Sequence, residues 1–107
     1  MSARPIPLRE AARRLEVAAR DAGLQVDRRN VVFRPTPFPS YEYVLWRQQA
    51  HAVLCMPADR VEADDWRAAL AEPMRRARAY LEPFVHIQER VDLAARGAPR
   101  FQQFLRV

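Results

Sequence analysis

The longest stretch of regularly spaced apolar residues lies in the second half of the chain, over residues 58–84. Its apolar positions recur at steps of three, four and seven, the spacing that places residues on one face of an α-helix. They comprise Trp66, Leu70, Ala77, Leu81 and Phe84, and Met74 and Tyr80 flank them. We expect Asp64 or Asp65 to begin this helix, because a short carboxylate accepts hydrogen bonds from the unpaired amides of a first turn. The charges run from acidic to basic along it, which complements the helix dipole.

Pro73 interrupts this pattern, because a proline inside a helix removes one backbone hydrogen bond and clashes with the preceding turn, at roughly 3 kcal/mol. The apolar stripe stays in phase on both sides of Pro73, so we predict one long kinked helix. Two short helices, with Pro73 at the first position of the second, are the alternative. Glu82-Pro83 predicts a break before a C-terminal helix that stops at Gly97. The apolar positions of that helix are Phe84, Ile87, Val91 and Ala94 or Ala95.

The first third of the chain predicts a helix followed by short strands. A helix over residues 7–22 should end at Gly23, a residue that readily takes the left-handed conformation of a helix stop. Its apolar face comprises Leu8, Ala11, Ala12, Leu15, Ala18, Ala19 and Ala22. The β-prone segments Leu24–Asp27 and Val31–Arg34 then predict a tight hairpin, with Asn30 in a left-handed turn position.

The middle of the chain predicts a stiff loop and two longer strands. Three prolines within residues 35–40 favour an extended loop. Its Phe38 either anchors the loop to the core, which is the outcome we expect, or is offered to a partner. Tyr41–Arg47 and Ala50–Met56 are rich in aromatic and β-branched residues, which favours two antiparallel strands joined near Gln48-Gln49. Because that turn lacks glycine and asparagine, a helix through residues 41–56 is the alternative.

Together these elements predict a small single α+β domain over residues 1–107. It has an N-terminal helix, an antiparallel sheet of three or four strands, the long kinked helix and the C-terminal helix. Residues 1–6 and 98–107 are expected to be flexible or docking arms. For the basic, apolar C-terminal tail, the sequence allows three structures: an edge strand, a short helix or a docking arm.

The order of the first elements resembles the α-β-β-β-α order of double-stranded RNA-binding domains, over about two-thirds of the chain. That family places basic residues at the start of its second helix, where they grip phosphates. The corresponding positions here are acidic, so membership is not predicted. They are Asp59, Glu62, Asp64 and Asp65.

The chain is basic, with a net charge of +5 from 18 arginines and no lysine. A basic balance permits contact with nucleic acid or acidic proteins. The joint abundance of arginine and alanine is also typical of GC-rich codon usage, which suggests a bacterial or phage origin. No apolar leader or membrane-length segment is present, so we expect a cytoplasmic protein without a membrane partner.

The residues needed for several kinds of chemistry are missing. Without lysine and with two glycines, the chain has no phosphate-binding P-loop and no lysine for a Schiff base. A single cysteine, Cys55, excludes an internal disulfide framework. His51 and Cys55 could form a base and nucleophile pair, but a core cysteine and a half-buried histidine are the commoner outcome. We therefore predict no catalytic residue, no metal site and no cofactor.

Arginine and aromatic side chains are the remaining candidates for function. Arg67, Arg75 and Arg78 share one side of the predicted central helix, and other basic residues flank aromatic ones near the predicted hairpin and strands. The full candidate set is Arg28, Arg29, Arg47, Trp46, Arg67, Arg75 and Arg78. Such residues are enriched at protein interfaces, which favours a non-enzymatic adaptor or inhibitor that binds a protein partner or a second copy of itself. Nucleic-acid binding, to a single strand or RNA, is the alternative.

Overall fold

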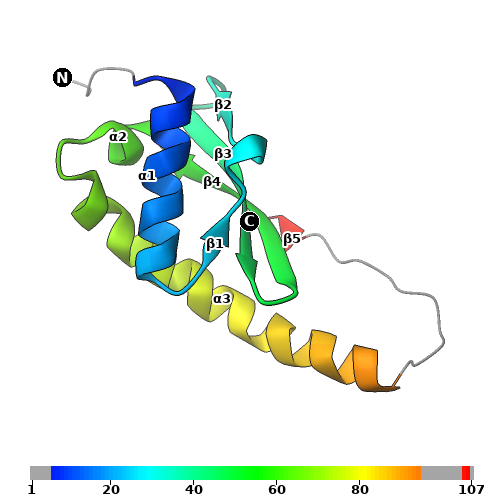
Figure 1. Cartoon of the computed structure of the whole chain (residues 1–107). Helices are drawn as coiled ribbons and strands as arrows, with labels where there is room; N and C mark the ends of the chain where they lie inside the picture. The colour runs from blue at the N-terminus through cyan, green and yellow to red at the C-terminus, as the bar shows by residue number, and fades with distance from the viewer. Residues whose placement is uncertain (1–5, 95–104, 107) are drawn as a thin grey trace.

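The computed structural model of this chain describes residues 6–94 and 105–106, with the side chains of residues 6–85. Helices and a β-sheet surround one core, which confirms the predicted α+β class (Figure 1). The elements in chain order are α1 (Leu8–Asp21), β1 (Gln25–Val26), the 3-10 turn η1 (Arg28–Asn30), β2 (Val32–Arg34), β3 (Ser40–Arg47), β4 (Ala50–Pro57), α2 (Ala58–Glu62), α3 (Trp66–Ala94) and β5 (Leu105–Arg106).

Strands β3 and β4 form the antiparallel centre of the sheet. Their register runs from Ser40 opposite Pro57 to Arg47 opposite Ala50, so the connection is a two-residue turn. Gln48 supplies the left-handed backbone of that turn, with φ of 52°. Non-glycine residues rarely adopt this conformation, which is why the sequence also allowed a helix through residues 41–56. The hairpin prediction is confirmed.

Strands β1 and β2 both pair with β3, and the predicted hairpin between them is wrong. Gln25 lies opposite Trp46 in the first pairing, and Phe33 lies opposite Tyr41 in the second. Between them the Asp27 carboxylate accepts hydrogen bonds from the Arg29 amide at 3.0 Å and from Asn30 Nδ2 at 2.8 Å. These bonds hold η1, so the chain continues along β3 instead of reversing. Strand β5 lies parallel to β4 on its other side.

Side chains alternate along the two central strands, as expected for a strand with a single buried face. The inner face is buried against the helices and comprises Tyr41, Tyr43, Leu45, Ala52, Leu54 and Met56. From α1 the core receives mostly alanines, which allow a close approach, and from α3 it receives Leu70, Met74, Leu81 and Val85. The outer face comprises Glu42, Val44, Trp46, His51, Val53 and Cys55. The aromatic residues Tyr41 and Tyr43 are thus core residues.

Helix α1 ends as its sequence predicts. Gly23 follows the last turn with φ of 77°, its amide bonds to the Arg20 carbonyl at 3.0 Å, and the Leu24 amide bonds to the Ala19 carbonyl at 2.8 Å. This pair of bonds is the Schellman motif, which satisfies carbonyls that the helix end would leave unpaired. Pro7 stands just before the helix, one position earlier than predicted.

The central helix starts where the sequence predicts and extends further. The Asp65 carbonyl accepts a bond from the Ala69 amide at 2.9 Å, which places Asp65 in the N-cap position of α3. The predicted C-terminal segment is helical, but α3 runs through Pro83 to Ala94 and the predicted break is absent. Leu81 and Val85 are both buried on either side of Pro83, and their packing offsets the lost backbone bond. The kink at Pro73 stays a prediction.

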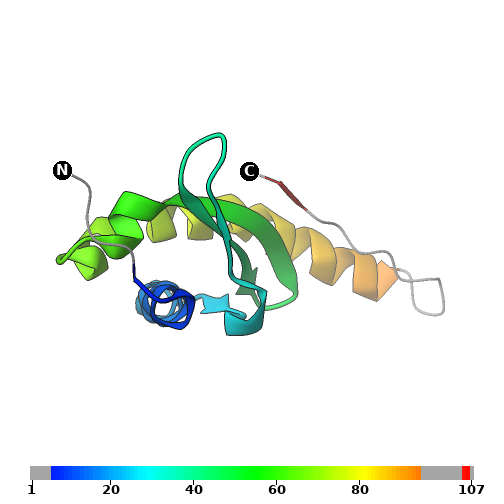
Figure 2. The same ribbon diagram turned by 90° about the horizontal axis from the view of Figure 1, so that it is seen from above.

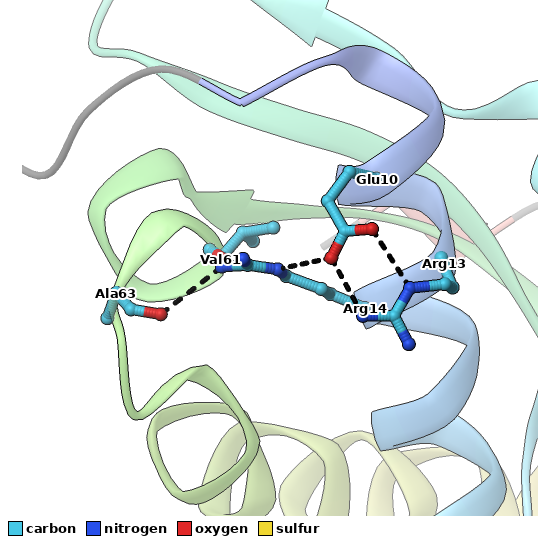
Figure 3. Close-up of polar contacts among 5 residues, drawn as sticks. All are labelled: Glu10, Arg13, Arg14, Val61 and Ala63. Carbon is cyan, nitrogen blue, oxygen red and sulfur yellow. Dashed lines mark hydrogen bonds and ion pairs between the residues drawn. The ribbon is translucent and has the colours of Figure 1, made fainter.

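One arginine ties α2 and the start of α3 to α1 (Figure 3). Arg14 donates from Nη1 to the carbonyl oxygens of Val61 and Ala63 at 3.0 and 3.2 Å, and from Nε to Glu10 at 2.9 Å. Its guanidinium also lies 5.4 Å from the centre of the Trp66 ring. These contacts hold the short helix α2 in place and so fix the position of the groove described next.

The predicted arms fall largely outside the described residues. Of residues 1–6 only Ile6 is described, and it packs against the core. Of residues 98–107 only Leu105 and Arg106 are described, and they form the parallel edge strand β5.

Candidate protein-binding groove

An open apolar groove lies at the end of the molecule where the start of α1, strand β2 and helix α2 meet (Figure 1). Its volume is about 740 Å³. Volumes of this size fall in the range of ligand sites, which are typically lined by apolar side chains with a few polar groups. The lining comprises Ile6, Leu8, Phe33, Phe38, Pro39, Tyr41, Pro57, Ala58, Asp59 and Glu62.

The groove gathers apolar side chains that the fold leaves exposed. Phe38 is 50% exposed, Leu8 48% and Phe33 42%. Within the described residues these are three of the five large hydrophobic side chains that are exposed, and all three line this one hollow. Contiguous apolar surface of this kind marks interaction sites more often than scattered single residues do.

The local sequence explains why these side chains remain uncovered. Phe33 and Tyr41 lie opposite each other on the inner face, with ring centres 5.3 Å apart. Helix α1 begins only at Leu8, and Phe33 remains 42% exposed. The expectation that Phe38 anchors its loop to the core is wrong. Prolines on both sides fix the backbone around Phe38 and remove its neighbours' amide donors, which holds the ring at the groove.

Two carboxylates of α2 form the charged part of the groove lining. The Tyr41 hydroxyl donates to Glu62 Oε2 at 2.9 Å. Burial, together with this bond to a carboxylate, raises the pKa of Tyr41 to about 12. Asp59 is exposed on the first turn of α2 and has no hydrogen-bond or ion-pair partner among the described residues.

Asp59 and Glu62 have no arginine partner among the described residues, although the chain is rich in arginine. Thirteen arginines and eleven carboxylates fall within residues 6–85, so this part carries two of the five net positive charges. Seven of those carboxylates have an arginine within 4.0 Å. The four carboxylates without an arginine partner all lie in one short segment and are Asp59, Glu62, Asp64 and Asp65.

Most of the arginines predicted as binding residues are engaged within the molecule. Arg67 pairs with Asp21 at 2.6 Å, and this bond holds the pKa of Asp21 below its usual value. Three further ion pairs join the predicted residues to carboxylates, namely Arg28 with Glu16, Arg47 with Glu82, and Arg75 with Glu72. These arginines serve separate intramolecular contacts, and their charge is largely balanced where they lie.

The remaining predicted residues also lie apart. Arg78 donates to the Ala22 carbonyl at 3.0 Å, beside the end of α1. Arg29 has a side chain that is 96% exposed, with its Nε 4.0 Å from Asp27. Trp46 lies on the outer face of the sheet, where its ring centre is 4.4 Å from that of His51. The structure therefore does not bring the seven predicted residues into one surface.

His51 and Cys55 share the outer face of β4, as a strand with four-residue spacing requires. The expected burial is reversed, since Cys55 is exposed and His51 is 8% exposed beneath its contact with Trp46. Four residues of strand span about 13 Å, so no hydrogen bond can join the two side chains. Among the described residues, no group of three or more potential ligands could hold a metal ion.

Sequence reasoning did not find the groove, although it considered Phe38 as a residue offered to a partner. The exposed Phe38 between prolines was the one available signal. Leu8 and Phe33 gave none, because they meet Phe38 only through the pairing of β2 with β3.

Comparison with known proteins gives no relative. No protein-family model matches the chain, and no curated protein or solved structure is similar to it. Within the described part of the chain, no helix is both long enough and apolar enough to span a membrane.

Proposed function

We propose that this chain is a non-enzymatic protein-binding module, a small bacterial or phage accessory protein of the cytoplasm that acts as an adaptor or inhibitor. The observation that carries the proposal is the convergence of Leu8, Phe33 and Phe38 on one groove. Each Å² of apolar surface that a partner covers stabilises the complex by about 25 cal/mol. A partner that fills the groove gains this stabilisation, which the fold itself leaves unused.

The chemistry of the groove favours a protein segment over nucleic acid. Its lining is apolar apart from Asp59, Glu62 and the Tyr41 hydroxyl, and carboxylates repel phosphates. Nucleic-acid binding through the arginines stays a prediction. A salt titration tests it, because phosphate contacts make affinity fall steeply as salt rises.

The proposal is tested by selecting binders from a phage-displayed library of random 12-residue peptides against the full chain. We expect enriched peptides to bind the wild type and to bind the double variant Phe33→Ser, Phe38→Ser at least about tenfold more weakly. Tyr80→Ser is the matched control, since Tyr80 is 40% exposed and lies outside this groove. Circular dichroism confirms that each variant is folded.

Two outcomes contradict the proposal. One is a library that yields no peptide whose binding is weakened by the substitution of Phe33 and Phe38. The other is a dimer in solution that Phe38→Ser dissociates, which would assign the groove to a second copy of the chain.

A further inference from the structure

We infer that the groove selects a basic segment of its partner, in which an arginine or lysine stands next to a bulky apolar residue. This inference rests on the proposed function. The apolar side chain would enter the hollow formed by Phe33, Phe38 and Leu8, and the cationic group would meet Asp59 and Glu62 on α2.

The first argument is charge complementarity within the lining. Among the described residues that line the groove, Asp59 and Glu62 are the only charged ones, and both are acidic. They lie three positions apart in α2, a spacing that puts both side chains on one face of a helix. An arginine of a partner could bind such carboxylates through its planar fork of donors, and lysine could bind them as a point charge.

The second argument is that no arginine among the described side chains neutralises these acids. The nearby Arg14 is occupied by Glu10 and by the carbonyl oxygens of Val61 and Ala63. Arg60, on the same short helix, donates instead to the Ala69 carbonyl at 3.2 Å. Within residues 6–85, every acid outside residues 59–65 has an arginine partner, whereas this pair remains available to an external cation.

The third argument is the fixed position of Glu62. Its Oε2 atom accepts the bond from the buried Tyr41, while its other carboxylate oxygen has no partner among the described residues. A carboxylate held in this way has already lost much of its rotational freedom. Binding a cation there costs less ordering entropy than binding it to a freely rotating side chain.

The neighbouring acids Asp64 and Asp65 lie just before α3 and not on α2. Asp65 takes the N-cap position of α3, and Asp64 precedes it. Neither of them lines the groove, whereas Asp59 and Glu62 do. Asp64 is exposed and without an ion-pair partner in the described part of the chain, as Asp59 is, so it provides a matched control.

The test repeats the library selection on the wild type, on Asp59→Arg and on the double variant Asp59→Arg, Glu62→Arg. We expect wild-type binders to be enriched in arginine or lysine beside an aromatic or aliphatic residue. The double variant, whose groove carries the opposite charge, should bind these peptides at least about tenfold more weakly and should enrich acidic peptides. Asp64→Arg should keep the wild-type preference. Asp59→Arg alone serves if the double variant fails to fold, because Asp59 makes no described contact that the fold requires.

The outcomes separate this inference from the proposed function. Peptides that depend on Phe33 and Phe38 but show no basic preference would overturn the inference and leave the proposed function standing. Equal loss of binding in Asp64→Arg and Asp59→Arg would also overturn it, since it would show a general effect of charge. Absence of any groove-dependent peptide would overturn both.

Discussion

Glu10 is the side chain whose charge the fold stabilises most clearly. Its carboxylate accepts hydrogen bonds from Arg13 and Arg14, and these bonds lower its pKa from 4.5 to about 2. Through Arg14 the same cluster reaches the end of α2 (Figure 3). A surface ion pair alone contributes little, but this one also positions a helix that lines the groove.

We expect Glu10→Gln to reduce the free energy of unfolding at pH 7 by about 1 kcal/mol, because a neutral amide replaces a carboxylate that accepts three charge-assisted bonds at a partly exposed site. Since folding lowers the pKa of Glu10, its contribution is complete above about pH 4.5 and is lost as the pH falls towards 2. Urea unfolding at pH 7 and pH 2.5 measures this. A difference between the two proteins that is as large at pH 2.5 as at pH 7 would contradict it.

At Gly23 we expect substitution by alanine to destabilise the protein by about 1–2 kcal/mol. The backbone there has φ of 77°, and an added Cβ would lie 3.0 Å from Arg78 Nη1. Urea denaturation of Gly23→Ala, Arg78→Ala and the double variant measures the two causes separately. If contact with Arg78 contributes, the double variant will be less destabilised than the sum of the single variants.

At the scale of elements, the turn between β3 and β4 contains a residue that fits its conformation poorly. Gln48→Gly should stabilise the hairpin by about 0.5–1 kcal/mol, because glycine takes a positive φ without a steric penalty. The measurement is the midpoint of thermal unfolding. Gln49→Gly is the control, since Gln49 does not have positive φ, and it should leave the midpoint unchanged or lower it. A lower midpoint for Gln48→Gly would contradict the argument.

The elements that could be predicted from the sequence are those whose structure depends on residues close together in the chain. The spacing of apolar residues predicted α1 and the start of α3, and the content of aromatic and β-branched residues predicted β3 and β4. The short strands β1 and β2 could not be placed, because each pairs with β3 and neither pairs with the other. The course of the chain there depends on one capping side chain, Asp27. At Pro83 tertiary packing overrode the local preference for a break.

The site was less predictable than the fold for the same reason. Two of the predicted arginines have partners that are distant in sequence, namely Arg67 with Asp21 and Arg47 with Glu82. Charge along the chain therefore overstates the charge that the surface offers to phosphates. The groove draws on α1, β2, β3 and α2 together, and only the assembled sheet brings these elements to one place.

At the scale of the whole molecule, one core joins α1, the inner face of the sheet, α2 and α3 as far as Val85. Helix α3 runs beyond the sheet, as both views show, and the Cα trace measures 54 Å along its longest axis (Figures 1 and 2). Because the sheet and helices share this core, neither can lose its packing without exposing the apolar face of the other.

We therefore expect a single cooperative unfolding transition. Trp46 lies on the outer face of the sheet and Trp66 lies at the start of α3, so single-tryptophan variants Trp46→Phe and Trp66→Phe report on different parts of the molecule. Each variant should give the same urea midpoint by fluorescence as by far-ultraviolet circular dichroism. A midpoint for Trp66 fluorescence clearly below that of the same variant's circular dichroism would indicate that the helices separate first.

The prolines around Phe38 also affect how the protein behaves at high concentration. Strand β2 pairs with β3 on one side only, and open strand edges can recruit further strands and start fibrils. Here the edge is three residues long and runs directly into Pro35, Pro37 and Pro39, which carry no amide hydrogen to bond to an incoming strand. The segment that exposes the Phe38 ring at the groove is thus also one that resists the growth of intermolecular sheets.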